Sequence, residues 1–460
     1  MTKRRAIPLF GVLLLAAAGV ALALYLTNKR DVTTSSDEAY RVYREAVENE
    51  RRFYVKEAQA GFAKALELDP EFAMAMAGLA RYAERDRSLA LLKQADRLRS
   101  RLSERERLQI DLQLAMREKG PEAALKVARQ ILAAYPNDFR SASIVAHHEK
   151  AVGNHEEALR VFRRLLEADP NSADAYNMIG YYHGFRGDYE RAIESLKKYQ
   201  FMAPDQANPH DSLGEIQAYS GRYDEAIESL NRALRVKPDF FAAYDHLGVA
   251  YEGKGDPAKA REHFRKAAEL SPLDKDGYLF KALRTTFYDG NREAFREITA
   301  DLAKLPASDY SDRHAAFVKA CELLLAGRPA EAEAALVELR PRLEAHFREK
   351  NQNARLKYYE PAWNFLTARA RIAQGKDAQA IPLLEEMASP PNPWEAFEGR
   401  LWVYQAKAQL AVLLAKRGEL DRAEKLLEEN HRWNPSWAPT RPAEQTVAQL
   451  RRAKVLAAAK

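Results

Sequence analysis

The stretch GYYHGFRGDYERAIESLKKY, residues 180–199, places small residues, a turn and aromatic residues at positions that serve no evident chemistry. Apolar side chains recur at helical spacing on both sides of Gly187, which indicates two helices. Gly187 itself supplies the left-handed residue that commonly ends a helix. Gly180 and Ala192 are small, and paired helices approach closely only where the side chains between them are short. The stretch therefore predicts a packed pair of helices, 173–185 and 189–201.

The same pattern recurs every 34 residues around this stretch. Five prolines keep the period, at Pro136, Pro170, Pro204, Pro238 and Pro272. Five alanines keep it too, at Ala124, Ala158, Ala192, Ala226 and Ala260. A fixed period of about 20–50 residues is the signature of a solenoid, in which each repeat is a small unit that packs on its neighbours. The sequence therefore predicts an all-α array of antiparallel helix pairs.

Residues 139–272 resemble four consecutive tetratricopeptide repeats. The segments LEADPNSADAYNMIG, residues 166–180, and LRVKPDFFAAYDHLG, residues 234–248, are similar to that family's junction between repeats. The resemblance implies a right-handed superhelical solenoid whose first helices line a concave surface. It also implies a scaffold that binds other proteins.

The repeat pattern weakens on both sides of these four regular repeats. Residues 31–138 are predicted to form irregular or degenerate pairs of the same kind, because Pro70 lies 66 residues before Pro136, two short of a double period, and Leu112 stands where a small residue is expected. Ser103 and Glu106 have the spacing of a capping box, so a helix is expected to begin near residue 104. Residues 273–460 keep the helix-pair pattern without the fixed period and are predicted to end in a polar cap.

All five tryptophans lie in this last region, at Trp363, Trp394, Trp402, Trp433 and Trp437. They are expected to fill a thicker, less regular core or cap. Trp394 lies in a proline-rich loop and is alternatively an anchor for a partner. Cys321 is the only cysteine, which excludes an internal disulfide and a paired-cysteine zinc site. Its apolar surroundings predict a buried thiol.

Residues 1–30 form a basic segment around a long apolar run. Residues 1–30 contain five Lys and Arg residues and no acidic residue, so the formal charge of +6 for the whole chain leaves the remainder nearly neutral. A nucleic-acid partner is therefore not expected. The uncharged run, residues 6–26, is long enough to cross a bilayer as one helix.

We expect this run to be a single-pass transmembrane anchor, with the N-terminus inside and the body of the protein on the periplasmic or extracytoplasmic side. The alternative is a signal sequence that is cleaved before secretion, because residues 21–23, Ala-Leu-Ala, resemble a cleavage site. Both interpretations predict that the body of the protein is exported.

The sequence shows no motif for catalysis or cofactor binding. It lacks a phosphate-binding glycine loop, a nucleophile elbow and a helical HExxH pair. Histidines cluster in HHEKAVGNHEEA, residues 147–158, but His155 falls at the position of Tyr189 and Tyr223 in the next repeats, which is a packing position. We therefore expect no metal, no cofactor and no small-molecule substrate.

The resemblance directs attention instead to the concave face of the regular repeats. Residues four apart on the first helices form a stripe, which begins with Ser143, His147 and Ala151. The partner-binding residues predicted on this stripe are Asn177, Tyr181, Phe185, Asp211, Glu215, Tyr219, Asp245 and Glu252. The stripe is polar, acidic toward its C-terminal end, and lacks the lysine, asparagine and arginine pattern of chaperone-binding members. It is expected to accept a segment with basic and apolar side chains, or alternatively to be a solvated inner surface.

Three functions follow as hypotheses. The first is a non-catalytic, membrane-tethered scaffold or adaptor that binds a protein or peptide partner in the concave groove. The second is a structural subunit of a larger membrane-associated complex, packed through its convex and C-terminal surfaces. The third is an enzyme with a site in residues 273–460, where the repeat resemblance is weakest.

Overall fold

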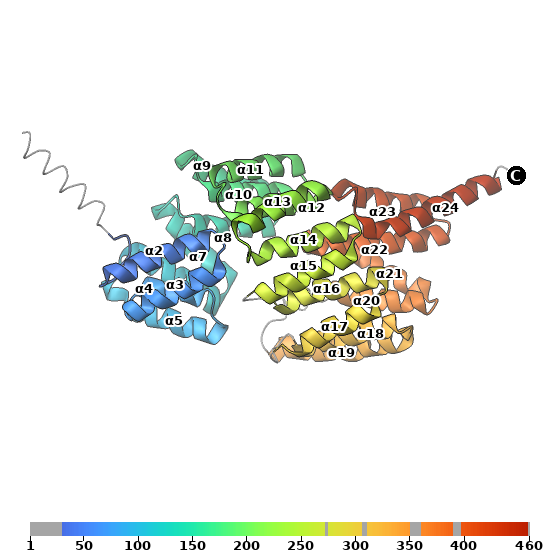
Figure 1. Cartoon of the computed structure of the whole chain (residues 1–460), viewed down its shortest axis with the longest axis horizontal. Coiled ribbons are helices and arrows are strands. Elements are labelled where there is room, and N and C mark those ends of the chain that lie inside the picture. The colour runs from blue at the N-terminus through green and yellow to red at the C-terminus, as the bar shows by residue number, and fades with distance from the viewer. Residues whose placement is uncertain (1–29, 272–274, 306–310, 350–359, 390–396, 459–460) are drawn as a thin grey trace, which may run out of the picture. The chain divides into compact units, whose positions relative to one another are not determined.

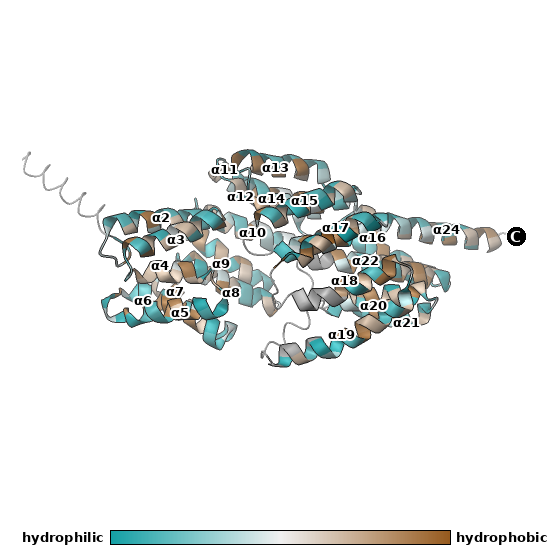
Figure 2. Cartoon of the chain, turned by 60° about the horizontal axis from the view of Figure 1, so that its bottom comes forward, coloured by the Kyte–Doolittle hydropathy of each residue, from teal (hydrophilic) through white to brown (hydrophobic). Residues whose placement is uncertain are grey.

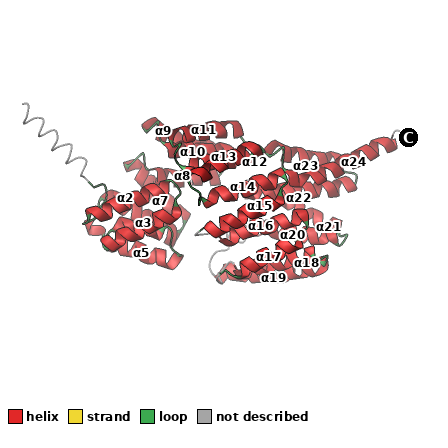
Figure 3. Cartoon of the chain, in the orientation of Figure 1, coloured by secondary structure: helices red, strands yellow, loops and turns green. Residues whose placement is uncertain are grey.

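The computed structural model describes residues 30–271, 275–305, 311–349, 360–389 and 397–458 of the 460-residue chain. Every regular element in these ranges is a helix, as Figure 3 shows, so the predicted all-α fold is confirmed. Consecutive helices pack on each other as in a solenoid, and contacts divide the chain into two compact units, Met1–Gly153 and Asn154–Lys460. The domain boundaries predicted after residues 30, 138 and 272 stay predictions.

The first unit holds the helices that precede Gly153. They are α2 (Asp37–Arg51), α3 (Val55–Leu68), α4 (Ala73–Ala80), α5 (Arg85–Arg97), η1 (Arg99–Arg101), α6 (Glu104–Leu114), η2 (Ala115–Lys119), α7 (Pro121–Ala134) and α8 (Phe139–Ala151). Its largest buried core includes Phe62, Phe72, Leu92 and Ile110. All eight residues of α4 are buried. They are also apolar, which accounts for the pale and brown colour of α4 in Figure 2.

The start of α6 confirms the helix predicted near residue 104. The Ser103 hydroxyl accepts a hydrogen bond from the main-chain N–H of Glu106 at 3.3 Å. In return, the Glu106 carboxylate accepts one from the main-chain N–H of Ser103 at 2.8 Å. Both partners of the capping box are therefore in place, which satisfies two donors that a helix start would leave unpaired.

The second unit holds the remaining helices. They are α9 (His155–Ala168), α10 (Ala173–Phe185), α11 (Tyr189–Met202), α12 (Ala207–Tyr219), α13 (Tyr223–Val236), α14 (Phe241–Lys254), α15 (Pro257–Leu270), α16 (Lys275–Asp289), α17 (Arg292–Ala303), α18 (Ser311–Leu325), α19 (Pro329–Glu349), α20 (Glu360–Ala373), α21 (Asp377–Ala388), α22 (Phe397–Lys416), α23 (Leu420–Trp433), η4 (Ala438–Thr440) and α24 (Arg441–Ala458). The helix pair predicted from residues 180–199 is confirmed, because α10 has the predicted bounds and α11 ends one residue later.

Two glycines explain the geometry of this pair. Gly187 has a φ of 76°, the left-handed conformation that ends α10 and starts the turn into α11. Gly180 faces α11 so closely that a Cβ there would lie 2.6 Å from Cγ of Leu196. In this pair, one glycine thus lies where the first helix ends and another where the first helix touches the second.

The chain between α23 and η4 folds back onto the helix pairs of the same unit. We call residues 433–438 the C-terminal strap. It lies along the turns that follow α10, α12 and α14, and η4 contacts α14. In Figure 1 the helices that flank the strap, α23 and α24, are drawn to the right of α12 and α14. The Trp433 ring lies directly on Gly187, and the Trp437 ring lies on Gly253.

Hydrogen bonds hold the middle of the strap. The Tyr223 hydroxyl, at the start of α13, donates to Oδ1 of Asn434 at 2.9 Å. Nδ2 of Asn434 donates to the carbonyl oxygen of Ala218 at 3.4 Å. Asn434 is 2% exposed, so these bonds form in a buried environment where an unpaired amide would be costly. The strap is thus part of the packed structure of the second unit.

The tryptophans and the cysteine mostly follow prediction. Trp363 and Trp437 are buried, and Trp402 and Trp433 are half-buried against the core, so their packing role is confirmed. Trp394 lies outside the described residues. Cys321 is buried as predicted, and burial raises the pKa of its thiol to about 12.

The predicted membrane anchor, residues 6–26, also lies outside the described residues. Within the part of the chain that the structure does describe, no helix is both long enough and apolar enough to span a bilayer.

Candidate functional site

The residues predicted to bind a partner lie on the first helices of three successive pairs. Asn177, Tyr181 and Phe185 lie on α10, Asp211, Glu215 and Tyr219 lie on α12, and Asp245 and Glu252 lie on α14. α12 contacts both α10 and α14, so we refer to these eight residues together as the inner face. Five of them are buried, and Tyr181, Phe185 and Glu215 are half-buried. The upstream residues of the predicted stripe, Ser143, His147 and Ala151, lie on α8 in the first unit.

Tyr181 connects α10 to α12. Its hydroxyl donates a hydrogen bond of 2.6 Å to the Glu215 carboxylate and lies 3.3 Å from the Ser212 hydroxyl. Burial, followed by the charges of Glu215 and Asp211, raises the pKa of Tyr181 well above its ordinary value. The phenol therefore stays protonated and keeps its role as a donor.

His246 connects α12 to α14. Its Nδ1 lies 2.8 Å from a carboxylate oxygen of Asp211, and its Nε2 lies 3.5 Å from one of Glu215. Burial alone would lower the pKa of this histidine, but the two carboxylates outweigh it and raise the pKa to about 10. His246 is therefore a cation at neutral pH, held between two anions.

Two cations on α16 complete the arrangement. Nζ of Lys281 donates to both carboxylate oxygens of Asp245, at 2.7 and 2.9 Å. The Arg284 guanidinium donates two bonds to Glu252, at 3.0 and 2.7 Å, and lies 5.8 Å from the ring centre of Trp402 on α22. Glu252 is 1% exposed, so removal of either charge from this pair would leave the other buried without its partner.

The inner face is thus a ladder in which carboxylates on one helix pair with cations on the next. Sequence reasoning identified the acidic residues but missed His246, Lys281 and Arg284. A signal for them exists, because each follows its partner by close to one repeat, at separations of 35, 36 and 32 residues. The acidic character expected of this surface is therefore largely neutralised by the chain itself.

Asn177 and Phe185 lie at the α10 end of the inner face. Asn177 is 5% exposed, and no described residue forms a hydrogen bond with its Oδ1. The rings of Tyr181 and Phe185 are 6.3 Å apart and tilted, and both are half-buried. This end therefore offers aromatic surface that remains partly accessible.

The histidine cluster at residues 147–158 does not converge. Nδ1 of His147 lies 2.7 Å from the carbonyl oxygen of Ser143, on its own helix, and Glu149 pairs with Arg129. Across the described ranges, no three His, Cys, Asp or Glu side chains come together as a metal ion would require.

Comparison with protein families identifies the repeats. Residues 146–207 and 212–275 match the tetratricopeptide repeat family. These two segments are tetratricopeptide repeats. They contain α10, α11, α13, α14, α15 and most of α12, and therefore every residue of the inner face except Asp211, which lies between the two segments.

Solved structures of other repeat proteins are similar to parts of the chain. MamA from Desulfovibrio magneticus is 25% identical, with a TM-score of 0.30, over 36% of this chain and 94% of that one. A thermophilic tetratricopeptide repeat protein of Thermus thermophilus is 24% identical, with a TM-score of 0.33, over 36% of this chain and 91% of that one. The Cut9-Hcn1 hetero-tetramer of the APC/C is 14% identical, with a TM-score of 0.49, over 94% of this chain and 81% of that one.

Each of these TM-scores is below 0.5, so the assignment of the repeats rests on the family match and on the helix pairs themselves. A comparison with curated protein sequences finds no match. The tetratricopeptide repeat fold suggests a scaffold for protein–protein interactions.

Proposed function

We propose that the chain is a non-catalytic scaffold, tethered to a membrane by residues 6–26 and exported beyond it, which binds a segment of a partner protein on the inner face. The observation that carries this proposal is the ladder of paired side chains on α10, α12, α14 and α16. Its salt bridges and hydrogen bonds fix the rotamers of the inner face before any partner arrives. A preorganised surface loses less conformational entropy when it binds, which favours affinity.

The partly accessible end of the inner face determines which segment fits. The half-buried rings of Tyr181 and Phe185 offer apolar contact, and Glu215 is a half-buried carboxylate that can accept further hydrogen bonds. We propose a segment with an apolar side chain for the rings and a nearby basic side chain for Glu215. Asp211, Asp245 and Glu252 are buried and paired with His246, Lys281 and Arg284. Their role in the proposal is to hold the side chains of the ladder in place.

The experiment compares two aromatic residues on successive helices. Phe185→Ser changes the inner face, and Phe201→Ser changes a phenylalanine on α11 that is 86% exposed. Each full-length variant would be solubilised in detergent from the protein's own cells, and proteins captured with it would be quantified against the unchanged chain. The proposal expects at least one partner to be lost with Phe185→Ser and kept with Phe201→Ser. If the captured proteins are the same for both variants and the unchanged chain, the inner face is not the binding surface.

Phe201 also favours the second candidate function, a structural subunit of a larger membrane-associated complex. A phenylalanine exposed on the second helix of a repeat pair is a suitable contact for a permanent neighbour on the convex side. Loss of the partners with Phe201→Ser alone would support this function in place of the inner-face scaffold.

The membrane tether has its own test. The full chain and a chain that lacks residues 1–29 would be expressed in the same cells, and their membrane and soluble fractions would be compared after an alkaline wash. We expect the full chain to remain with the membrane and the shortened chain to be soluble. Recovery of the full chain in the soluble fraction would contradict the anchor, and a mass that corresponds to cleavage near residue 23 would support the secreted alternative.

A further inference from the structure

The outer side of α11 and α13 carries an exposed phenylalanine. Phe201, in the last turn of α11, is 86% exposed, and Val236, at the end of α13, is 37% exposed. Figures 1 and 2 both show α11 and α13 at the upper edge of the second unit. Arg222, immediately before α13, pairs with Glu190 of α11. The two helices therefore lie side by side and present their last turns to solvent.

Basic residues surround these two apolar side chains. Lys197 precedes Phe201 by four residues, so the two side chains share one face of α11. Arg232 precedes Val236 by the same interval on α13. Arg235 follows Phe201 by 34 residues, so it occupies the equivalent position one repeat later. The phenylalanine thus lies among cations of its own helix and of the neighbouring one.

The chain does not balance these charges. Residues 194–202 and 228–237, the second halves of the two helices, hold five basic residues and two acidic ones. Lys197, Arg232 and Arg235 are exposed, and none of them has an ion pair or a hydrogen bond with a described residue. This side of the helices therefore carries a net positive charge, which attracts anions.

Lys198 adds a fourth cation. It pairs with Glu194 at 3.1 Å, but both side chains are more than half exposed, and such pairs contribute little to stability. Lys198 can therefore exchange this partner for another anion. We call the whole set the outer basic surface, which consists of Lys197, Lys198, Phe201, Arg232, Arg235 and Val236.

An apolar ring among cations fits the surface of an anionic bilayer. Aromatic and aliphatic side chains enter the boundary between headgroups and acyl chains, while Lys and Arg remain among the headgroups. Each basic residue near anionic lipids adds to the attraction. A ring that projects from the outer side of a helix needs no preformed pocket in lipid, whereas an acidic protein would have to supply one. The exposure of Phe201 therefore favours lipid over an acidic protein.

We propose that the outer basic surface binds anionic phospholipid headgroups at the surface of a bilayer, with the ring of Phe201 inserted between them. This contact goes beyond the scaffold function and does not require residues 6–26. Where those residues tether the chain to a membrane, they raise the effective concentration of lipid and so strengthen the contact.

The test measures how a bilayer protects the lysines of this surface. The purified full chain would be freed of detergent in the presence of vesicles of phosphatidylcholine alone, or of phosphatidylcholine and phosphatidylglycerol in equal amounts. A reagent that does not cross membranes, N-hydroxysulfosuccinimide acetate, would then acetylate the accessible lysines, and mass spectrometry would quantify each one. We expect acetylation of Lys197 to fall by at least roughly threefold with the anionic vesicles and to be unchanged with the neutral ones.

Lys425 on α23 is the internal reference. It is exposed, and acidic residues lie one helical turn away on either side, at Asp421 and Glu429, so anionic lipid should not protect it. Acetylation of Lys197 relative to Lys425 corrects for chains enclosed within vesicles. Sedimentation of the chain with the neutral vesicles reports on residues 6–26 alone, so failure of the tether is distinguished from failure of the outer basic surface.

A first pair of variants tests the aromatic contact. Phe201→Ser should reduce the protection of Lys197 by roughly twofold or more, because the surface loses its apolar anchor. Val337→Ser is the control, since Val337 is 62% exposed on α19, away from this surface, and it should leave the protection unchanged.

A second pair of variants tests the charges. Arg232→Gln combined with Arg235→Gln should reduce the protection of Lys197 by at least as much. Arg292→Gln combined with Arg296→Gln, at exposed positions one turn apart on α17, should leave it unchanged. The comparison of the two kinds of vesicle on the unchanged chain stands without any variant.

Three outcomes would overturn the proposal. The first is equal acetylation of Lys197 with both kinds of vesicle. The second is protection that persists at full strength in both the Phe201 and the double arginine variants. The third is protection by poly-L-glutamate in solution where the anionic vesicles give none, which would assign the outer basic surface to an acidic polypeptide.

Discussion

His246 makes the charge balance of the inner face depend on one proton. It lies between Asp211 and Glu215, and these carboxylates raise its pKa from the ordinary 6.5 to about 10. The folded state therefore binds this proton more tightly than the unfolded chain does. The contribution of His246 to stability is fully present below about pH 6.5 and is lost as the pH rises through about 10.

We expect the urea midpoint of the second unit to fall as the pH is raised between these two values. His246→Gln keeps a hydrogen-bond donor but cannot ionise, so its midpoint should change less over the same range. Circular dichroism of both proteins in parallel urea titrations would measure the difference. Parallel curves for the two proteins would show that the His246 proton is not linked to folding.

Among the residues that the structure describes, Phe53 is the one non-glycine residue with a positive φ, which is 61°. It follows α2 at the kind of helix-ending position that glycine occupies after α8, α10, α12 and α14. The left-handed conformation costs an L-residue about 1–2 kcal/mol, and the ring of Phe53 is 52% exposed, so little packing offsets that cost.

Phe53→Gly should therefore stabilise the first unit by about 1 kcal/mol, measured as the free energy of unfolding in urea. Phe53→Ala is the control, because it removes the ring but keeps the strained conformation, and it should give little or no gain. If both variants destabilise the unit equally, the Phe53 ring holds the structure and strain is not the dominant effect.

The inner-face residues illustrate which part of the site could be predicted at this scale. Asp211 and Glu215 could be placed on one surface because helical spacing and the repeat period fix their positions. His246, Lys281 and Arg284 could not, because their pairing depends on how one repeat is rotated against the next. Burial of Asp245 and Glu252 follows from the same contacts between repeats, which a single-repeat pattern does not contain.

At the scale of elements, the C-terminal strap distinguishes this unit from an open array of repeats. In an open solenoid each repeat touches only its neighbours, and stability is the sum of local terms. Here Trp433, Asn434 and Ala438 contact the turns after α10, α12 and α14, and Trp437 packs on Gly253 in the last turn of α14. The strap therefore connects three repeats that are otherwise linked only through their neighbours.

Substitution of Gly187 tests the contact between the strap and the first of these turns. Gly187→Ala places a methyl group against the Trp433 ring, and it also strains a left-handed position. Gly327→Ala is the control, with a φ of 74° against 76° for Gly187 and no neighbouring atom within 4 Å. We expect Gly187→Ala to destabilise the unit by about 1–3 kcal/mol more than Gly327→Ala, in urea unfolding.

A double variant separates the clash from other effects of the alanine. Gly187→Ala combined with Trp433→Leu should lose less stability than the sum of the two single changes, because the smaller leucine makes room for the methyl group. Strict additivity would show that Gly187 and Trp433 do not interact in solution.

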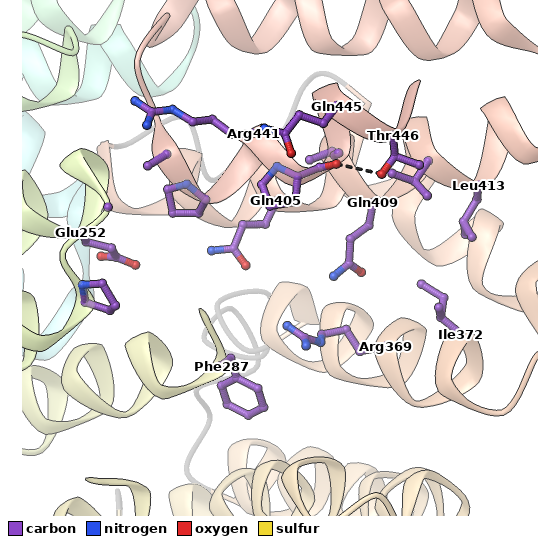
Figure 4. Close-up of a pocket in the computed structure, with 18 of the residues that line it drawn as sticks. Glu252, Phe287, Arg369, Ile372, Gln405, Gln409, Leu413, Arg441, Gln445 and Thr446 are labelled. Carbon is purple, nitrogen blue, oxygen red and sulfur yellow. Dashed lines mark hydrogen bonds between the residues drawn. The ribbon is translucent and has the colours of Figure 1, made fainter. Parts of the chain in front are cut away.

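The helices themselves were predictable from sequence, and the strap was not. The 34-residue period predicted the bounds of α10 and, within one residue, of α11, and the Ser103 capping box predicted the start of α6. The strap has no period and pairs residues that are distant in sequence, so no local pattern indicates where it binds. A cavity of about 840 Å³ beside the strap (Figure 4) could not be predicted for the same reason, since its lining residues come from α14, α16, α20, α22 and α24.

At the scale of the whole molecule, each of the two units contains a buried core of its own. The core that contains Phe62 and Leu92 lies wholly before Gly153, and the cores that contain Leu196 and Leu414 lie wholly after it. Each unit therefore has the apolar interior that independent folding requires.

We expect residues 30–153 and 154–460, expressed separately, each to be helical by circular dichroism and to unfold cooperatively on heating. The control is a pair of fragments divided at residue 238, inside the core of the second unit. These should unfold without a cooperative transition or aggregate. Failure of both 30–153 and 154–460 to fold would show that the division at Gly153 does not separate independent units.

The strap also sets an order of events during synthesis. The hydrogen bond from the Tyr223 hydroxyl to Asn434 cannot form until Asn434 has been synthesised, 211 positions later in the chain. At about 5–20 residues per second, a ribosome needs roughly 10–40 s to cover that distance. During this time the turns of the early repeats are uncovered and open to chaperones or to a partner, and that opportunity closes when the C-terminus emerges.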